Sequence, residues 1–248
     1  MASLSLDFTG VGLGKSAGLQ DLRAVGTASL HGQQQFLATD LLYCKNCMVL
    51  QGKIKSLEPS SSGPVERDVV CKYRDDDISL LEHEAGVYEG DLRELQGVAV
   101  PCFHGLFKGS YLLGSGKEKR IACIILDYIP SDRSWDLWDG PAETRCVCTK
   151  SAKESPKVYV PYRVAIAHTM LQIHKAGVLQ GDFADANILV SGSGDVRIVD
   201  FDQATHHDCQ ADPEMNVWNY EPSECEYGCG EMYDAIQALE LWTPSKRV

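Results

Sequence analysis

The sequence lacks a long hydrophobic run, an N-terminal secretion signal and an excess of positive charge. A membrane-spanning helix needs about 20 consecutive apolar residues, and no apolar run of this chain reaches that length. The first residues, Met-Ala-Ser-Leu-Ser-Leu-Asp, contain neither the basic segment nor the apolar core of a signal peptide. Lys and Arg number 23 and Asp and Glu number 35, for a formal net charge of -12, which argues against a nucleic-acid backbone as partner. We therefore expect a protein of the cytoplasm or the nucleus that binds neither membranes nor nucleic acids.

A disulfide framework is not indicated either, although the chain has ten cysteines. Disulfides persist mainly in oxidising compartments, and no secretion signal is visible. The cysteines that lie close together in sequence form three pairs, which are Cys44 and Cys47, Cys146 and Cys148, and Cys225 and Cys229. Their spacings match no standard zinc framework, so we expect free thiols. His206 and His207, near Cys209, could bind a metal but are expected to line a solvated loop.

Composition and length are those of a folded globular protein. The 248 residues are 44% hydrophobic and 23% charged, which is close to the globular average, and a chain of this length forms one domain or two small lobes. Residues 1–35 are rich in Gly and Gln and weakly periodic, so we expect a flexible segment there. Residues 36–128 read mainly as short strands with one helix over 78–95, whereas the stronger helical patterns lie in residues 129–248.

The clearest chemical pattern lies in the second half of the chain. A helix predicted over 162–175 is followed by Gly181-Asp182 and, five residues after Asp182, by Asn187. A predicted hairpin then ends at Asp200. Two oxygen donors, Asn187 and Asp200, suit Mg²⁺, which keeps substrate phosphates in its coordination shell. Asp182 is left to orient or deprotonate a hydroxyl group, and this division of roles is that of phosphoryl transfer.

These motifs resemble those of the protein-kinase-like superfamily. Residues 162–189 are similar to its catalytic helix and loop, and Asp200-Phe201-Asp202 is similar to its metal-binding Asp-Phe-Gly motif with the glycine replaced. Together with the segment at 95–101, which begins Leu-Gln-Gly and ends Val-Pro, they resemble short fungal-type protein kinase domains. The resemblance implies ATP and Mg²⁺ as cofactors.

The fold implied by the resemblance is an α+β, two-lobed protein-kinase-like fold, which would cover residues 36–248. Residues 36–128 would form a small β-rich N-lobe. Residues 129–248 would form a shortened, mainly α-helical C-lobe, because the chain ends about one helix after the motif region.

The same resemblance implies roles for individual residues. Lys72 would hold the α- and β-phosphates of ATP, and Glu84 would be its helix partner, with Glu82 and Glu89 as alternatives. The remaining assignments are the catalytic base Asp182, the Mg²⁺ ligands Asn187 and Asp200, and the hinge residues that would meet adenine, Asp127, Tyr128 and Ile129.

Several positions depart from the family pattern. Gln180-Gly181 stands where protein kinases have His-Arg, Ala184 and Ala186 replace the part of the loop that supplies a basic residue, and no Gly-rich loop precedes Lys72. The glycine before the catalytic aspartate resembles small-molecule kinases as much as protein kinases. We expect an ATP- and Mg²⁺-dependent phosphotransferase that acts on a hydroxyl acceptor, in the first place protein Ser or Thr. The alternatives are a small-molecule kinase of the aminoglycoside or choline type, and a catalytically impaired pseudokinase that serves as an ATP-binding or interaction module.

Overall fold

The computed structural model divides into two compact units, which are described separately below. The first unit comprises Met1–Gly90 and Pro101–Tyr128, and the second comprises Asp91–Val100 and Ile129–Val248. The residues that the structure describes are 2–12, 21–44, 47–57, 66–75, 77–112, 115–131, 156–211 and 219–243.

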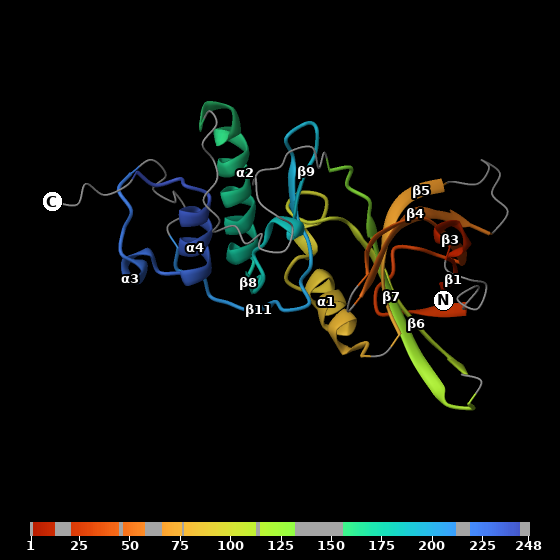
Figure 1. Ribbon diagram of the computed structural model, residues 1–248. Coiled ribbons are helices and arrows are strands. Elements are labelled where there is room, and N and C mark those ends of the chain that lie inside the picture. Colours follow the sequence, from red (N-terminus) through yellow and green to blue (C-terminus); the bar gives the residue numbers. More distant parts are fainter. Residues whose placement is uncertain are drawn as a thin grey trace. The chain divides into compact units, whose positions relative to one another are not determined.

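The first unit is built around a closed β-barrel (Figure 1). Among the described residues the strands of the barrel are β1 (Ser3–Asp7), β2 (Asp21–Val25), β3 (Gln33–Cys44), β4 (Met48–Ser56), β5 (Glu66–Arg74), β6 (Phe103–Leu112) and β7 (Glu118–Asp127). A 3-10 turn, η1 (Thr9–Val11), follows β1, and one helix, α1 (Ser79–Glu89), follows β5. The order around the barrel is β1-β2-β6-β7-β5-β4-β3. Neighbouring strands are antiparallel except for β1 and β3, whose parallel pairing closes the sheet.

The expected two-lobed protein-kinase-like fold is wrong, and with it the resemblance to short fungal-type protein kinase domains. The described part of the chain forms a closed seven-stranded barrel of mixed pairing and only a few helices. The error has a physical origin, since local patterns predict strands but not which strands pair. β1 and β2 lie in the segment 1–35 that we had set apart from the folded region, and closure depends on pairing Leu4 with Gln34.

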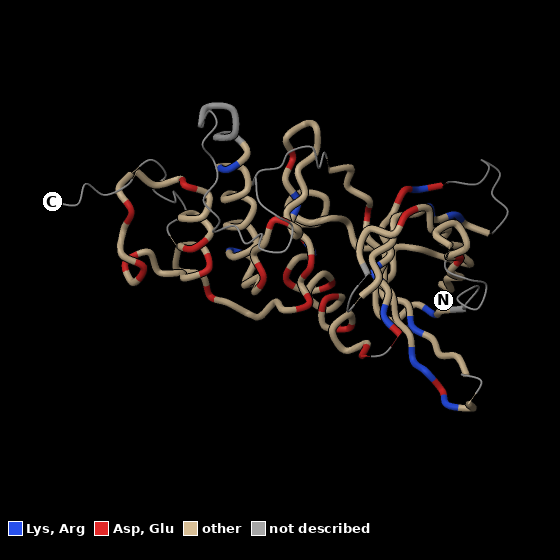
Figure 2. Tube along the Cα trace, in the orientation of Figure 1, with Lys and Arg blue, Asp and Glu red and all other residues tan. Residues whose placement is uncertain are grey.

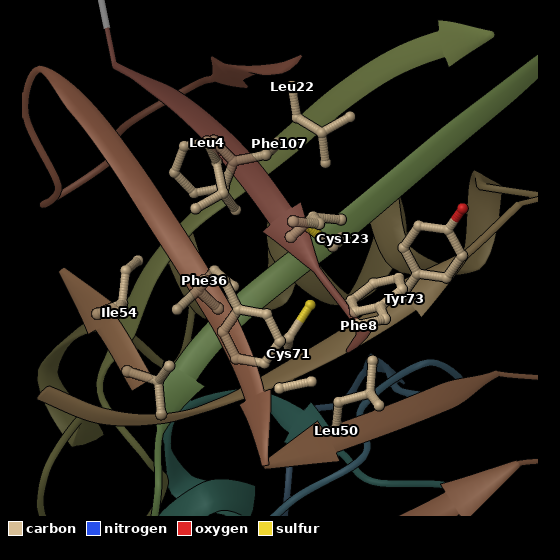
Figure 3. Close-up of a cluster of buried hydrophobic side chains, with 14 of the residues drawn as sticks. Leu4, Phe8, Leu22, Phe36, Leu50, Ile54, Cys71, Tyr73, Phe107 and Cys123 are labelled. Carbon is tan, nitrogen blue, oxygen red and sulfur yellow. The ribbon is translucent and has the colours of Figure 1, made fainter. Parts of the chain in front are cut away.

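The barrel interior is filled by apolar side chains from every strand (Figure 3). Alternation along β1 places Leu4 and Leu6 on one face, and both are fully buried. The ring of Phe8 meets those of Phe36 and Tyr73 edge to face, with centroids 6.4 and 5.4 Å apart, which is a favourable geometry for aromatic pairs. The other labelled members of this core in Figure 3 are Leu22, Leu50, Ile54, Cys71, Phe107 and Cys123.

Helix α1 packs on the outside of the barrel against β6 and β7. Its buried residues are Leu81, Glu84, Ala85 and Tyr88, a three-and-four spacing that places them on one face. The ring of Tyr88 stacks on Phe103 of β6 with centroids 5.6 Å apart and an interplanar angle of 6°. An acidic residue, Glu84, is therefore part of the buried face of this helix.

Basic residues recur along the ribbon formed by β6 and β7, although the chain is acidic overall (Figure 2). Lys108 of β6 lies 2.5 Å from a carboxylate oxygen of Glu82 on α1. Lys119 of β7 lies 2.8 Å from Asp75. Two of the basic residues of this ribbon are thus paired with acidic residues of the first unit.

The second unit combines helices with two short two-stranded sheets. Its elements are η3 (Arg93–Leu95), α2 (Pro156–Lys175), β8 (Val178–Leu179), η4 (Asp185–Asn187), β9 (Ile188–Val190), β10 (Val196–Ile198), β11 (Thr205–His206), α3 (Glu224–Tyr227) and α4 (Gly230–Ala238). β9 pairs with β10 and β8 with β11, both antiparallel, and α2 contacts β8, β10 and α4.

The predicted helix over 162–175 and the hairpin before Asp200 are confirmed. Cys146 and Cys148 lie outside the described residues. No described helix has the length and apolar character needed to cross a membrane.

Substitution of two glycines of the first unit, Gly52 and Gly86, tests how tightly the barrel is packed. A Cβ atom at Gly52 of β4 would overlap the carbonyl oxygen of Leu37 and lie 2.7 Å from ring carbons of Phe36, whereas a Cβ atom at Gly86 of α1 would meet nothing within 4 Å. We predict that Gly52→Ala lowers the free energy of unfolding by about 1–3 kcal/mol through overpacking. Gly86→Ala should raise it by about 0.5–1 kcal/mol because alanine is the better helix former. Urea unfolding of both variants provides the measurement, and equal stability of the two would contradict the packing described here.

Candidate functional site

The loop between β8 and β9 carries two of the residues predicted to act in phosphoryl transfer. The Asn187 side chain is buried, and its Nδ2 atom donates to the carbonyl oxygen of Asp182 at 2.9 Å and to Asp182 Oδ2 at 3.1 Å. Asp182 itself is exposed. The structure therefore brings Asp182 and Asn187 together and leaves the Asp182 carboxylate open to solvent.

The buried side chain of Gln180 links this loop to Asp200. Its Nε2 atom donates to the carbonyl oxygen of Asp200 at 2.9 Å, and its Oε1 atom accepts a hydrogen bond from the N–H of Asp182 at 2.7 Å. The N–H of Val199 donates to the carbonyl oxygen of Asn187 at 3.0 Å. Two backbone segments 18 positions apart in the chain, at Asp182 and Asp200, are thus fixed to one amide group.

We did not predict a structural role for Gln180 from the sequence, where it was noted only as a departure from the family pattern. Its place directly before Gly181-Asp182 was the available signal. A glutamine amide offers both a donor and an acceptor, which is what a bridge between an N–H group and a carbonyl group requires.

Asp200 has a backbone φ of +68°, in the left-handed region that non-glycine residues rarely occupy. Aspartate and asparagine tolerate this region better than most residues. Such conformations persist where the surrounding structure enforces them, and they concentrate at functional sites. The hydrogen bond from Gln180 Nε2 to the carbonyl oxygen of Asp200 helps to hold this conformation.

A glutamate on α4 anchors the turn that precedes Asp182. Glu231 accepts hydrogen bonds from the N–H of Gln180 at 3.0 Å, from the N–H of Gly181 at 2.7 Å and from His174 Nε2 at 2.7 Å. Burial alone would raise the pKa of Glu231, but these three hydrogen bonds outweigh it and hold the pKa below its usual value. Glu231 was not among the residues predicted from the sequence.

Gly181 occupies a position that a larger residue would strain. Its φ is +85°, and a Cβ atom there would lie 2.7 Å from the carbonyl oxygen of Gln203. Both the backbone conformation and the available space therefore favour glycine. The glycine next to Asp182 is explained by local packing of the second unit.

In the first unit, the structure joins Lys72 to Glu84. β5 alternates, so that Cys71 and Tyr73 belong to the barrel core while Lys72 faces the side on which α1 packs. Lys72 Nζ lies 2.6 Å from Glu84 Oε2, and both side chains are buried. Removing one member of such a pair leaves an uncompensated buried charge, which costs about 3–5 kcal/mol.

The two alternative partners of Lys72 are engaged elsewhere. Glu82 pairs with Lys108, as described above. Glu89 accepts a hydrogen bond from the N–H of Thr27 at 2.7 Å. Of the three glutamates considered from the sequence, Glu84 is the one that the structure places against Lys72 at ion-pair distance.

Asp127 and Tyr128 lie at the end of β7, and Ile129 follows them at the start of the second unit's main segment. The N–H of Asp127 donates to the carbonyl oxygen of Cys102 at 3.0 Å, and the N–H of Tyr128 donates to the carbonyl oxygen of Asp68 at 3.3 Å. An adenine contact through these two N–H groups would have to replace both hydrogen bonds. The Asp127 carboxylate accepts a 2.6 Å hydrogen bond from Nε2 of the buried His104, which holds its pKa below the usual value.

The residue types at the predicted magnesium site suit a small, hard cation. Asp182, Asn187 and Asp200 offer carboxylate and amide oxygens, and oxygen is the ligand that Mg²⁺ prefers. Asn187 uses its nitrogen for Asp182, so its Oδ1 atom is the one suited to a cation. Binding of Mg²⁺ by Asn187 and Asp200 stays a prediction.

The Asp127–His104 contact generates a pH prediction. Because the pKa of Asp127 is lowered in the folded state, its stabilisation is present above the ordinary pKa of 3.8 and is lost as the pH falls through the folded-state value. We predict that Asp127→Asn lowers the free energy of unfolding by about 1–2 kcal/mol at neutral pH and flattens its decline in acid. Chemical denaturation between neutral and acidic pH measures both effects. Asp68→Asn, at an exposed side chain, is the control, and identical acid profiles for the wild type and Asp127→Asn would show that the contact contributes nothing.

Comparison with protein-family models and with curated proteins adds no relative. No protein-family model matches the sequence, and no curated protein matches it significantly. The function of the chain must therefore be argued from its own residues.

Proposed function

We propose that the chain binds ATP with Mg²⁺ and transfers the γ-phosphate to a hydroxyl group of an acceptor. The observation that carries this proposal is the arrangement around Gln180. One buried amide fixes the backbone at Asp182 and at Asp200, and Asn187 is hydrogen-bonded to Asp182. Phosphoryl transfer is catalysed mainly by positioning and by neutralisation of charge, and this arrangement holds Asn187 beside the exposed Asp182 and fixes the backbone of Asp200.

Each of these residues has a chemical role in the proposed reaction. Asn187 and Asp200 would hold Mg²⁺, and the ion would supply positive charge to the phosphate oxygens. Asp182 accepts the proton of the attacking hydroxyl group. The acceptor oxygen forms a bond to the γ-phosphorus, the bond from that phosphorus to the bridging oxygen breaks, and ADP leaves. Held by Asn187 Nδ2 at 3.1 Å, the Asp182 carboxylate is oriented for this role.

The first unit, taken by itself, carries a second feature with phosphate-binding chemistry, the Lys72–Glu84 pair. A lysine ammonium is a compact charge that binds phosphate oxygens, and here it is fixed by a buried carboxylate 2.6 Å away. A polar pair is costly to bury, so its presence on the face between β5 and α1 favours a role beyond stability.

Two classes of hydroxyl acceptor are compatible with the proposal, protein Ser or Thr and a small alcohol. Ala184 and Ala186 flank Asp185 in the loop and supply no positive charge near the transferred phosphate. This feature also favours a second candidate, a chain that binds ATP without turnover. Screening γ-phosphate transfer to peptides and to small alcohols would separate the two acceptor classes.

The proposed metal ligand Asp200 can be tested without disturbing its backbone. Asparagine also tolerates the left-handed conformation, so Asp200→Asn should fold while losing the anionic ligand. We predict that it weakens ATP binding measured in Mg²⁺ by about tenfold or more, which corresponds to about 1.4 kcal/mol, and has little effect on binding measured in EDTA. Asp195→Asn makes the same change at an exposed turn and should match the wild type. Unchanged Mg²⁺-dependent affinity in Asp200→Asn would remove Asp200 from the proposed site.

The proposed base Asp182 distinguishes an enzyme from a binding module. We predict that Asp182→Asn reduces γ-phosphate transfer by about 10²–10⁴-fold, the usual contribution of general acid–base catalysis, while ATP affinity changes little. Transfer of labelled γ-phosphate and titration with a fluorescent nucleotide measure the two quantities. Turnover that is equal in the variant and the wild type would exclude this role, and ATP binding with no turnover in the wild type would favour the binding module.

A further inference from the structure

Four side chains with metal-binding chemistry come together in the second unit, away from the residues assigned above to phosphoryl transfer. They are His174, His207, Cys209 and Cys229, and their ligand atoms all lie within 4.8 Å of one another. Three of the four are buried, and His207 is partly buried. Two imidazoles and two thiols at this spacing form a complete donor set for one ion.

The four residues come from separate parts of the unit. His174 lies in the last turn of α2, His207 and Cys209 follow β11, and Cys229 is the N-cap residue of α4. The N–H of His207 donates to the carbonyl oxygen of Gly177 at 2.8 Å, which holds the segment after β11 against the end of α2. Tertiary structure, and not sequence spacing, assembles the group.

Two distances within the cluster match tetrahedral coordination. Cys229 Sγ lies 3.5 Å from His174 Nδ1 and 3.3 Å from His207 Nε2. A tetrahedral zinc ion with bonds of about 2.3 Å to sulfur and about 2.0–2.1 Å to nitrogen separates its ligand atoms by about 3.3–3.8 Å. The two imidazole rings approach with centroids 5.2 Å apart and planes at 81°, so both can direct a nitrogen toward one point.

A carboxylate orients His174 through the ring nitrogen that does not face the cluster. His174 Nε2 donates to Glu231 Oε2 at 2.7 Å, so its proton lies on Nε2 and the lone pair of Nδ1 faces the cluster. Metal-binding histidines commonly use their second ring nitrogen in this way, because the carboxylate fixes the tautomer and raises the basicity of the ligand.

We propose that His174 Nδ1, His207 Nε2, Cys209 Sγ and Cys229 Sγ bind one Zn²⁺ ion in a closed, four-coordinate structural site. Thiolate and imidazole ligands in a tetrahedral set select zinc over the oxygen-preferring Mg²⁺ and Ca²⁺. With four protein ligands, no position is left for substrate, so the ion joins α2, α4 and the segment after β11. This inference is independent of the proposed phosphoryl transfer.

The site also reaches the turn before Asp182 through Glu231. The same carboxylate that orients His174 accepts the N–H groups of Gln180 and Gly181. Loss of the ion would free His174 to change its tautomer or ring position and so weaken the anchor of that turn. Zinc is expected to stabilise the second unit and to order this loop.

Metal analysis of the full chain tests the proposal. Protein expressed with added zinc and purified under reducing conditions should contain one equivalent of zinc per chain, and exchange with Co²⁺ should give the visible absorption of a tetrahedral thiolate site. Cys209→Ser and Cys229→Ser should each lose the zinc. Cys225→Ser is the matched control, because Cys225 is exposed and four residues from Cys229, and it should retain one equivalent.

A cysteine variant could lose zinc because it fails to fold, so the second test uses the wild-type protein. Treatment with a strong chelator should lower the midpoint of thermal unfolding, and addition of Zn²⁺, but not Mg²⁺, should restore it. Wild-type protein that is folded, lacks zinc after purification and binds none on titration would overturn the proposal. So would a Cys209–Cys229 disulfide in the native protein, detected as two thiols that appear only after reduction.

Discussion

The hydrogen bonds to Glu231 are the interaction on which the chemistry of the second unit depends. A carboxylate that is largely removed from solvent is stable only if its oxygens are paired. The half-buried Glu231 meets this need with three donors from two places in the chain, His174 on α2 and the N–H groups of Gln180 and Gly181. Two helices and the turn before Asp182 consequently share one anchor. The position of the loop that carries Asp182 therefore depends on the packing of α4.

The two sites proposed for the second unit use opposite coordination chemistry. Asp182, Asn187 and Asp200 offer oxygen atoms, which suit Mg²⁺, whereas the cluster around His174 and Cys229 offers nitrogen and sulfur, which suit zinc. Each set would discriminate against the ion of the other. A structural zinc ion and a catalytic magnesium ion could thus be bound by one unit without competing.

The first unit depends on closure of the barrel. Parallel pairing of β1 with β3 joins the ends of the sheet, and the enclosed core then fixes the pleat of β5. Since Cys71 and Tyr73 point inward, Lys72 must point outward, where Glu84 of α1 meets it. The buried ion pair is a consequence of this alternation.

Local sequence determined the pieces of this protein that depend on neighbouring residues. Helical periodicity predicted the helix over 162–175 and turn chemistry predicted the hairpin before Asp200, and the contact between Asp182 and Asn187 spans only five residues. Tertiary structure decided what depends on distant pairing. The parallel β1–β3 contact closed a barrel where a two-lobed kinase-like fold was expected. The thiols of Cys209 and Cys229 are free, as the sequence predicted, but their grouping with His174 and His207 comes from tertiary packing. Strand partners and side-chain clusters are set by three-dimensional proximity, which no local spacing encodes.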